Sequence, residues 1–322
     1  MSFEFLPESP ANSRGERGFR VIPSQGRDDR DTTPRCPARA TLDGCRPGCC
    51  FMLMIHFHIL GAGGATPVPG YSPAAYLVRL DDEPILMDPG PGALVRLVAA
   101  GLAPRGVDDV GLVLLTHLHP DHCLDLVALL FAAHSPLPAR TDPLRIWGPP
   151  GLKAFLEQLR GIWGRSLDPR SRQVEVRELA AGETVSLAGG SAIEPFAVDH
   201  PQDRLATVCH GYRFVDTEGQ VAVFSGDTGP CPALTAAARD ADLLVVECST
   251  TDDLATAGHM SPARVGELCA AARPRRVVLT HMYPPAAESD LVALVGAHTD
   301  VPVLQARDGT VVTVPTTEGD SP

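Results

Sequence analysis

The chain is poor in lysine and in aromatic residues. Lys153 is the only lysine among 27 basic residues, which 39 acidic residues outnumber to give a formal net charge of −12. That balance excludes a broad basic surface of the kind that follows a nucleic-acid backbone. With aromatic residues at 5%, a surface on which successive bases stack is not expected either. Nucleic acid, if it binds, has to be held locally.

Long apolar runs are also absent. A membrane-spanning helix needs roughly 18 or more consecutive apolar residues. The most apolar early stretch, residues 51–60, is shorter than that and contains His56 and His58. A secretory signal is not indicated, because no apolar centre lies near the start of the chain. We therefore expect a soluble protein with no membrane partner.

The cysteines show no pairing pattern. The nine cysteines are an odd number without recurring spacing, so a disulfide framework is not expected in a chain of 322 residues. Four of them fall in residues 1–50, but the two properly spaced ligand pairs of a small zinc knot are missing there. The remaining cysteines are interpreted as small buried apolar residues. These features favour a reducing cytoplasm.

The first fifty residues differ from the rest. They contain many arginines and acids with scattered proline and glycine and no sustained apolar period, which is typical of disorder. We expect residues 1–50 to be either a disordered extension or the product of a start assigned too early, with Met52 or Met54 as the true start. Residues 51–322, in a chain with 44% hydrophobic content, are expected to form one folded domain.

Local patterns predict an α/β protein. Strands are expected at residues 55–60, 75–80, 84–87, 111–115, 144–147, 173–177, 191–198, 211–215, 221–224, 242–246, 276–279, 301–306 and 310–314. Helices are expected at residues 93–100, 121–133, 152–159, 232–239, 262–272 and 289–297. This order predicts an αββα sandwich, in which two packed mixed sheets carry helices on their outer faces. Asp308-Gly309 predicts a closing hairpin between the last two strands.

One short run carries most of the chemistry. The expected strand at residues 111–115 is followed by Thr116-His117-Leu118-His119-Pro120-Asp121-His122. His117 and His119 are two positions apart, so in an extended segment their rings point to the same side. Asp121 and His122 follow the turn that Pro120 favours and can face a second ion. The run therefore predicts two metal half-sites, in preference to a polar helix cap.

Three further candidate ligands follow other expected strands. Asp227 and His281 each come directly after an apolar run, and His200 repeats this arrangement. Ligands at the ends of several strands are typical of sites that a rigid sheet positions. His200 is the least secure of the three, because His210 lies nearby and is an alternative. Asp227 could also be a simple turn former, although a carboxylate is the ligand type that can bridge two cations.

The chain resembles the metallo-β-lactamase fold family, on its ribonuclease Z-like and arylsulfatase-like side. The resemblance covers about residues 54–315 and is carried by seven segments in the family's order. These are Leu60-Gly61-Ala62-Gly63-Gly64, Leu86-Met87-Asp88-Pro89-Gly90, the run from His117 to His122, Gly211-Tyr212-Arg213, Ser225-Gly226-Asp227-Thr228, Gly258-His259-Met260-Ser261 and Leu279-Thr280-His281. Residues 51–322 would then be the catalytic domain.

The resemblance implies a dinuclear hydrolase of ester bonds. Two Zn²⁺ ions are expected, with Mn²⁺ or Fe as alternatives, and Asp227 would bridge them. One ion would be held by His117, His119 and His200, and the other by Asp121, His122 and His281. Such a pair lowers the pKa of a shared water, so that hydroxide is available near neutral pH.

The resemblance also implies a proton donor. His259 matches the general acid and Glu247 matches the carboxylate that orients it, while Asp121 would also orient the nucleophile. A simple loop histidine before the helix at residues 262–272 is the alternative for His259. Asp88 would support the metal loop without binding metal, or would be a plain turn former.

The substrate is less sharply indicated. Family members that process transfer RNA generally carry a protruding arm between the residues that match His200 and Asp227. That interval holds only one expected strand pair, which leaves no room for an arm and favours small phosphodiesters or sulfate esters. Transfer-RNA 3′ processing is the alternative, so RNA is not the favoured partner. An iron-dependent oxidoreductase on the same scaffold is an alternative of another class. The resembled family often forms dimers, which makes a homodimer a candidate assembly, but the sequence itself does not indicate the oligomeric state.

Overall fold

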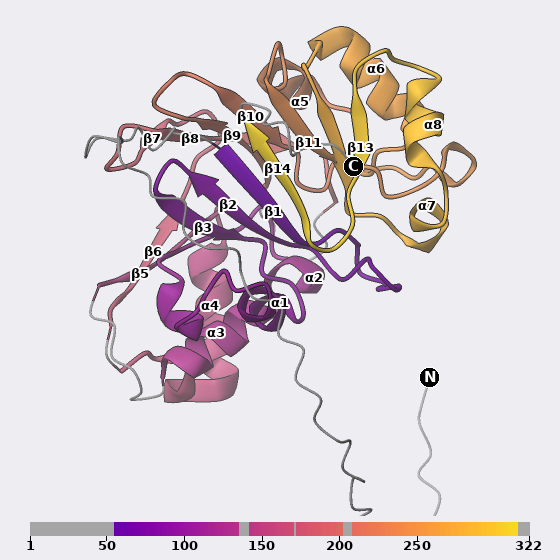
Figure 1. Ribbon diagram of the computed structural model, residues 1–322. Helices are drawn as coiled ribbons and strands as arrows, with labels where there is room; N and C mark the ends of the chain where they lie inside the picture. The colour runs from indigo at the N-terminus through magenta and orange to yellow at the C-terminus, as the bar shows by residue number, and fades with distance from the viewer. Residues whose placement is uncertain (1–54, 135–141, 171, 202–207, 315–322) are drawn as a thin grey trace, which may run out of the picture. The chain divides into compact units, whose positions relative to one another are not determined.

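The computed structural model describes residues 55–134, 142–170, 172–201 and 208–314. Residues 50–322 form one compact unit, which contains two seven-stranded sheets (Figure 1). The expectations for residues 1–50, including the extension and its four cysteines, lie outside the described residues. The expected α/β sandwich of two mixed sheets with helices outside them is confirmed.

The first sheet comes almost entirely from the first half of the compact unit. Its order is β14 (Thr310–Val314), β1 (Ile55–Gly61), β2 (Ala75–Leu80), β3 (Glu83–Met87), β4 (Leu112–Leu114), β5 (Leu144–Gly148) and β6 (Val174–Glu178). The pairings from β14 to β3 are antiparallel, and those from β3 to β6 are parallel. The parallel strands β3 to β6 therefore end at one common edge.

The second sheet has the same mixed pattern. Its order is β13 (Val303–Gln305), β12 (Val277–Thr280), β11 (Leu243–Glu247), β10 (Val221–Phe224), β9 (Cys209–Val215), β8 (Ala192–Val198) and β7 (Val185–Ser186). Strands β10 to β13 are parallel, and β7 to β10 are antiparallel. Strands β10, β11 and β12 thus also end at a common edge.

The main core lies between the two sheets. Alternation along β1 places Ile55, Phe57 and Ile59 in this core and leaves the intervening histidines half-buried. The aromatic rings interlock, with Tyr76 of β2 packed edge to face against Phe224 of β10 at 4.8 Å between ring centroids. Each such fully buried side chain contributes about 1.5–3 kcal/mol relative to exposure. This packing fixes the two sheets against each other.

Helices cover the outer faces of both sheets (Figure 1). A second apolar cluster joins the first sheet to α1 (Ala93–Ala99), α3 (Asp125–Ala133) and α4 (Leu152–Trp163). The second sheet packs against α5 (Pro232–Ala237), α6 (Pro262–Ala272) and α8 (Leu291–Gly296). Two four-residue helices, α2 (Pro120–Cys123) and α7 (Pro284–Ala287), follow strand ends. None of the described helices is long and apolar enough to cross a membrane.

Every expected strand is present, with bounds within two residues of the expected ones. The sequence pattern missed β7 and α7, which are two and four residues long, too short to show a period. The expected helix at residues 121–133 is divided into α2 and α3.

The predicted closing hairpin is wrong. Strand β13 pairs with β12, whereas β14 pairs with β1 in the other sheet. Asp308 and Gly309 do form a turn, but this turn carries the chain between the sheets. The Asp308 carboxylate accepts hydrogen bonds from the backbone N–H groups of Ala62 and Ser72, which ties the turn to the first sheet. A contact more than 230 residues away in sequence therefore overrides the local turn signal.

Gly90 marks a close backbone contact beside the strand ends. A Cβ atom at this position would lie 1.9 Å from the carbonyl oxygen of Asp121 and 2.6 Å from that of Ala74. Both neighbours are backbone atoms, which cannot turn aside as a side chain can. Gly90 therefore lets the loop after β3 press directly on the segment that carries Asp121.

We expect Gly90→Ala to lower the free energy of unfolding by about 1–3 kcal/mol, because the added methyl group overpacks the contact. Urea unfolding of the full chain measures this. Gly161→Ala is the matched control: Gly161 lies in α4 with no atom within 4 Å of the added Cβ, so the change should be neutral or stabilise by about 0.5–1 kcal/mol. Equal stability of the two variants would contradict the close contact.

Candidate metal centre

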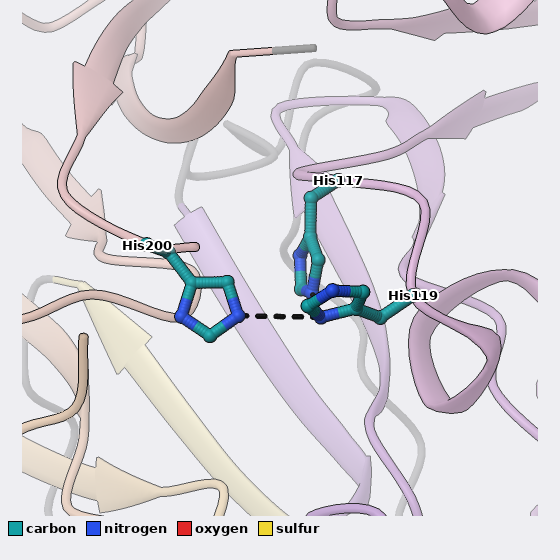
Figure 2. A group of neighbouring side chains, drawn as sticks. All are labelled: His117, His119 and His200. Carbon is teal, nitrogen blue, oxygen red and sulfur yellow. Dashed lines mark hydrogen bonds between the residues drawn. The ribbon is translucent and has the colours of Figure 1, made fainter. Parts of the chain in front are cut away.

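Three histidine nitrogens converge at the ends of strands β4 and β8. The side chains of His117, His119 and His200 point toward one another (Figure 2), and His119 Nδ1 lies 3.1 Å from His117 Nε2 and 3.2 Å from His200 Nε2. Zinc holds imidazole nitrogens at about 2.0–2.1 Å in a tetrahedral arrangement, which separates neighbouring nitrogens by about 3.3 Å. The spacing of these three atoms fits such an ion.

A second group of ligand atoms lies beside the first. His122 Nε2 is 3.0 Å from His281 Nε2, and Asp121 Oδ2 is 3.4 Å from His281 Nε2 and 3.6 Å from His122 Nε2. Two imidazoles and a carboxylate at this spacing could hold a second ion. The histidine run after β4 is thus divided between two groups, as its spacing predicts.

Asp227 lies between the two groups. One carboxylate oxygen, Oδ2, is 3.9 Å from both His117 Nε2 and His200 Nε2 and 3.3 Å from His281 Nε2. The other oxygen, Oδ1, is 3.4 Å from His122 Nε2. Asp227 is only 4% exposed, so its negative charge has little access to water. Asp227 thus has one oxygen near each of the two groups, as a carboxylate that bridges two ions would require.

The charges of these groups favour a cation. Burial would raise the pKa of Asp227, but the adjacent His281 and His122 hold that pKa well below its usual value. Burial likewise acts to lower the pKa of His122, yet Asp227 and Asp88 raise it well above the ordinary value. Positive charge is therefore favoured on His122 and beside Asp227. Burial lowers the pKa of His117 well below normal, so this ring is neutral and can bind metal.

Polar contacts outside the cluster orient its rings. Asp88, fully buried after β3, accepts hydrogen bonds from the Thr116 N–H and hydroxyl at 2.7 Å and faces His122 Nδ1 at 3.0 Å. His117 Nδ1 faces the Thr116 hydroxyl at 2.9 Å, and His200 Nδ1 faces the Gly258 carbonyl oxygen at 2.9 Å. These contacts leave the Nε2 atoms of the three histidines to face the centre. Asp88 thus has the contacts of a supporting carboxylate as well as the place of a turn residue.

His259 and Glu247 form a pair at the edge of the cluster. His259 Nδ1 lies 2.9 Å from Glu247 Oε1, and Glu247 is only 1% exposed. Burial acts to lower the pKa of His259, but the hydrogen bond and the charge of Glu247 outweigh it and raise that pKa above the ordinary value. The His259 ring centroid is 5.0 Å from that of His200. An imidazole whose protonated form is favoured by Glu247 therefore stands beside the first group of ligands.

His210 does not take part. Both of its ring nitrogens are buried without a hydrogen-bond partner among the described residues, and burial lowers its pKa to about 4. His200, by contrast, lies with His117 and His119. Of the two alternatives left open by the sequence, His200 has the position of a ligand.

Two residues of the site were not singled out from the sequence. Ser249 faces His281 Nδ1 at 3.0 Å, and Tyr283 packs edge to face against His281 and His259. Burial raises the pKa of Tyr283 to about 12, so its phenol stays protonated at neutral pH. No sequence signal marks Ser249, because its contact joins residues 32 apart through the pairing of β11 with β12.

Comparison with known proteins places this geometry in a family. Residues 84–282 match the family model of the beta-lactamase superfamily domain. The uncharacterized protein ML1173 of Mycobacterium leprae is 33% identical over 257 residues, which cover 78% of this chain and 86% of the relative. Ribonuclease Z of Mycobacterium marinum is 32% identical over 254 residues, 72% of this chain and 87% of the relative.

Solved structures share the fold. The metallo-beta-lactamase fold protein YhfI from Bacillus subtilis superposes with a TM-score of 0.68 at 23% identity, over 81% of this chain and 99% of that protein. The short form of human tRNase Z superposes with a TM-score of 0.63 at 23% identity, over 80% and 98%. With the family model covering more than half of the sequence, the chain belongs to the beta-lactamase superfamily as a ribonuclease Z-like metallo-hydrolase of the metallo-β-lactamase fold.

Proposed function

We propose that the protein is a two-metal-ion hydrolase of small phosphodiesters. The observation that carries this proposal is the pair of adjacent ligand groups with Asp227 between them. Five imidazoles and two carboxylates form a donor set that suits zinc, with manganese and iron as alternatives. We propose a reducing cytoplasm as its location, because the nine cysteines of the sequence show no pattern of disulfide pairing.

Each ion has its own ligands. His117, His119 and His200 would hold the first ion, and Asp121, His122 and His281 the second, while Asp227 would contact both. When bound, two such ions make a water acidic enough to act as a nucleophile near neutral pH and neutralise charge that develops on the ester. Asp121, at the edge of the second group, would also accept a hydrogen bond that orients the nucleophile.

His259 supplies the proton that the leaving group needs. Its Nδ1 is engaged by Glu247, which leaves Nε2 to carry the proton that is transferred. Glu247 itself is held by the backbone N–H groups of Thr228 and Met260, so the carboxylate has little freedom to move. This arrangement supports His259 as the general acid and Glu247 as the residue that orients it.

The size of the substrate follows from the segment between His200 and Asp227. Its described part, from residue 208, consists of the hairpin of β9 and β10, whose turn is closed by the Asp216 carboxylate. A short hairpin of this kind supports a small ester over transfer RNA. Sulfate esters are an alternative within the same chemistry. The similarity to the Mycobacterium marinum ribonuclease Z favours transfer-RNA 3′ processing as a second candidate.

We expect the full chain, purified without added metal, to contain two zinc ions and Asp227→Ala to contain one or none. Removal of the shared carboxylate should lower turnover by roughly 100-fold, because it loosens both ions. Elemental analysis and turnover measure these effects. Asp253→Ala is the control, since Asp253 is exposed and belongs to none of the described ligand groups. Two ions retained in Asp227→Ala would contradict the bridge, and iron in the purified wild type would favour the oxidoreductase alternative.

We expect His259→Ala to keep both ions and to lose roughly 100-fold or more in turnover. The general acid is active when protonated, so wild-type turnover should fall as the pH rises through the raised pKa of His259. This alkaline fall should be absent from the variant. Metal analysis and a pH profile of kcat measure both effects. Unchanged turnover would remove His259 from the mechanism.

A substrate panel tests the proposed activity. We expect release of p-nitrophenol from bis(p-nitrophenyl) phosphate, at a rate that exceeds the rates on an aryl sulfate, a thioester and a precursor transfer RNA. Faster cleavage of the transfer RNA would replace the small-ester proposal with the second candidate, and no turnover of any substrate would contradict the hydrolase proposal.

The homodimer stays a prediction, which light scattering on the purified chain would check.

A further inference from the structure

One serine connects the proton-donor pair to the second group of ligands. Ser249 is fully buried two residues after Glu247, at the end of β11. Its hydroxyl contacts Glu247 Oε2, lies 3.0 Å from His281 Nδ1 and lies 2.9 Å from the His281 carbonyl oxygen. The parallel pairing of β11 with β12, which places Glu247 beside Thr280, holds the two segments side by side. A continuous chain of contacts thus runs from His259 through Glu247 and Ser249 to His281.

The proton inventory of this chain fixes the form of His281. A serine hydroxyl carries one proton, and the Ser249 hydroxyl is directed as a donor toward Glu247 Oε2 and the His281 carbonyl oxygen. Whichever of these two oxygen atoms takes the Ser249 proton, none is left for His281 Nδ1. The imidazole nitrogen must therefore donate its own proton to Ser249 Oγ. His281 is then the tautomer whose Nε2 carries a free lone pair.

That free Nε2 atom is the one that faces the centre. It lies 3.3 Å from Asp227 Oδ2, 3.4 Å from Asp121 Oδ2 and 3.0 Å from His122 Nε2. His281 also has a left-handed backbone, with φ of 55°, which a residue with a Cβ adopts only at a cost of about 1–2 kcal/mol. A ring on such a strained position needs outside contacts to keep its orientation.

The other half of the site repeats the arrangement. Thr116 donates its hydroxyl proton to Asp88 Oδ2 at 2.7 Å, and His117 Nδ1 faces the same hydroxyl at 2.9 Å. Both halves therefore place a hydroxyl group between a buried carboxylate and a histidine. The recurrence of carboxylate, hydroxyl and imidazole argues that the Ser249 contact has a purpose beyond filling space.

We propose that Ser249 is a positioning residue that holds His281 ready to bind the second ion and ties this ring to the carboxylate that orients His259. This inference rests on the proposed two-ion function and assigns Glu247 two tasks. Oε1 is the oxygen nearer to His259 Nδ1, at 2.9 Å, while Oε2 accepts from Ser249 and lies 3.2 Å from His259 Nδ1. The general acid and the second ion site are thereby supported by one buried group.

The test is zinc affinity of the full chain, measured by competition with a chelator. Ser249→Ala should lower the affinity for one of the two ions by roughly 10–100-fold and leave the affinity for the other unchanged. Hydrogen bonds that orient a metal ligand typically contribute that much affinity. Ser249→Thr, which keeps the hydroxyl group, should restore the affinity for this ion. Ser191→Ala is the matched control: Ser191 is equally buried, but it precedes β8 at the end opposite His200, so both ions should bind normally.

A double-variant cycle separates positioning from general packing. If Ser249 acts through Glu247 on His281, the double variant Ser249→Ala/Glu247→Gln should lose no more affinity for the second ion than the single variant with the larger loss. Fully additive losses would overturn the connected chain. If Ser249→Ala binds two ions with wild-type affinity, the role of Ser249 is overturned and the proposed function is not affected. A wild-type protein that binds fewer than two ions would instead overturn the proposed function on which it rests.

A spectroscopic measurement covers the case in which Ser249→Ala does not fold. Nitrogen-15 NMR of histidine-labelled, zinc-loaded wild type should show a proton on His281 Nδ1, with its signal identified by loss in His281→Gln. A bare or metal-bound Nδ1 at His281 would contradict the proposal without any variant of Ser249.

Discussion

The candidate site depends on the convergence of seven side chains that could bind metal on a space a few ångströms across. Five imidazole nitrogens point their lone pairs inward, and two carboxylates add negative charge where water has little access. Such an arrangement is unfavourable by itself, because lone pairs and like charges face one another at about 3 Å. Cations held between these groups would replace the repulsion with coordination. The same surroundings act differently on two of the rings: Asp227 and Asp88 outweigh burial and raise the pKa of His122, whereas burial lowers the pKa of His117.

The sandwich makes this convergence possible by aligning strand ends. Asp88 and the histidine run follow β3 and β4, while Asp227, Glu247 and His281 come from the ends of β10, β11 and β12. The interlocked core between the sheets holds the two sets of ends together, so that His122 and His281 meet although 159 residues separate them. Left-handed backbone at Asp88 and His281 shows that the fold accepts local strain where these side chains must turn inward.

Much of the fold and of the candidate site could be predicted from the sequence. The alternation of apolar residues indicates the strands, and the His117 to His122 run has a spacing that few contexts other than a metal site require. The candidate ligands that come directly after other expected strands were predicted by the same reasoning. The choice between His200 and His210 could not be predicted, because His200 follows a strand and His210 lies at the start of one. Only the packing of β8 against the loop that carries His117 distinguishes the two histidines. The role of Asp308 was likewise hidden, since a turn signal does not reveal which sheet receives the next strand. Ser249 is the clearest case, because its partners are defined only by how β11 and β12 pair.

The central claim is that two metal ions share Asp227. Anomalous X-ray diffraction from crystals of the full chain, recorded on both sides of the zinc absorption edge, tests it most directly. The account predicts two peaks, one within reach of His117, His119 and His200, the other within reach of Asp121, His122 and His281, with a carboxylate oxygen of Asp227 in contact with each. A single peak, or two peaks of which neither touches Asp227, would contradict it.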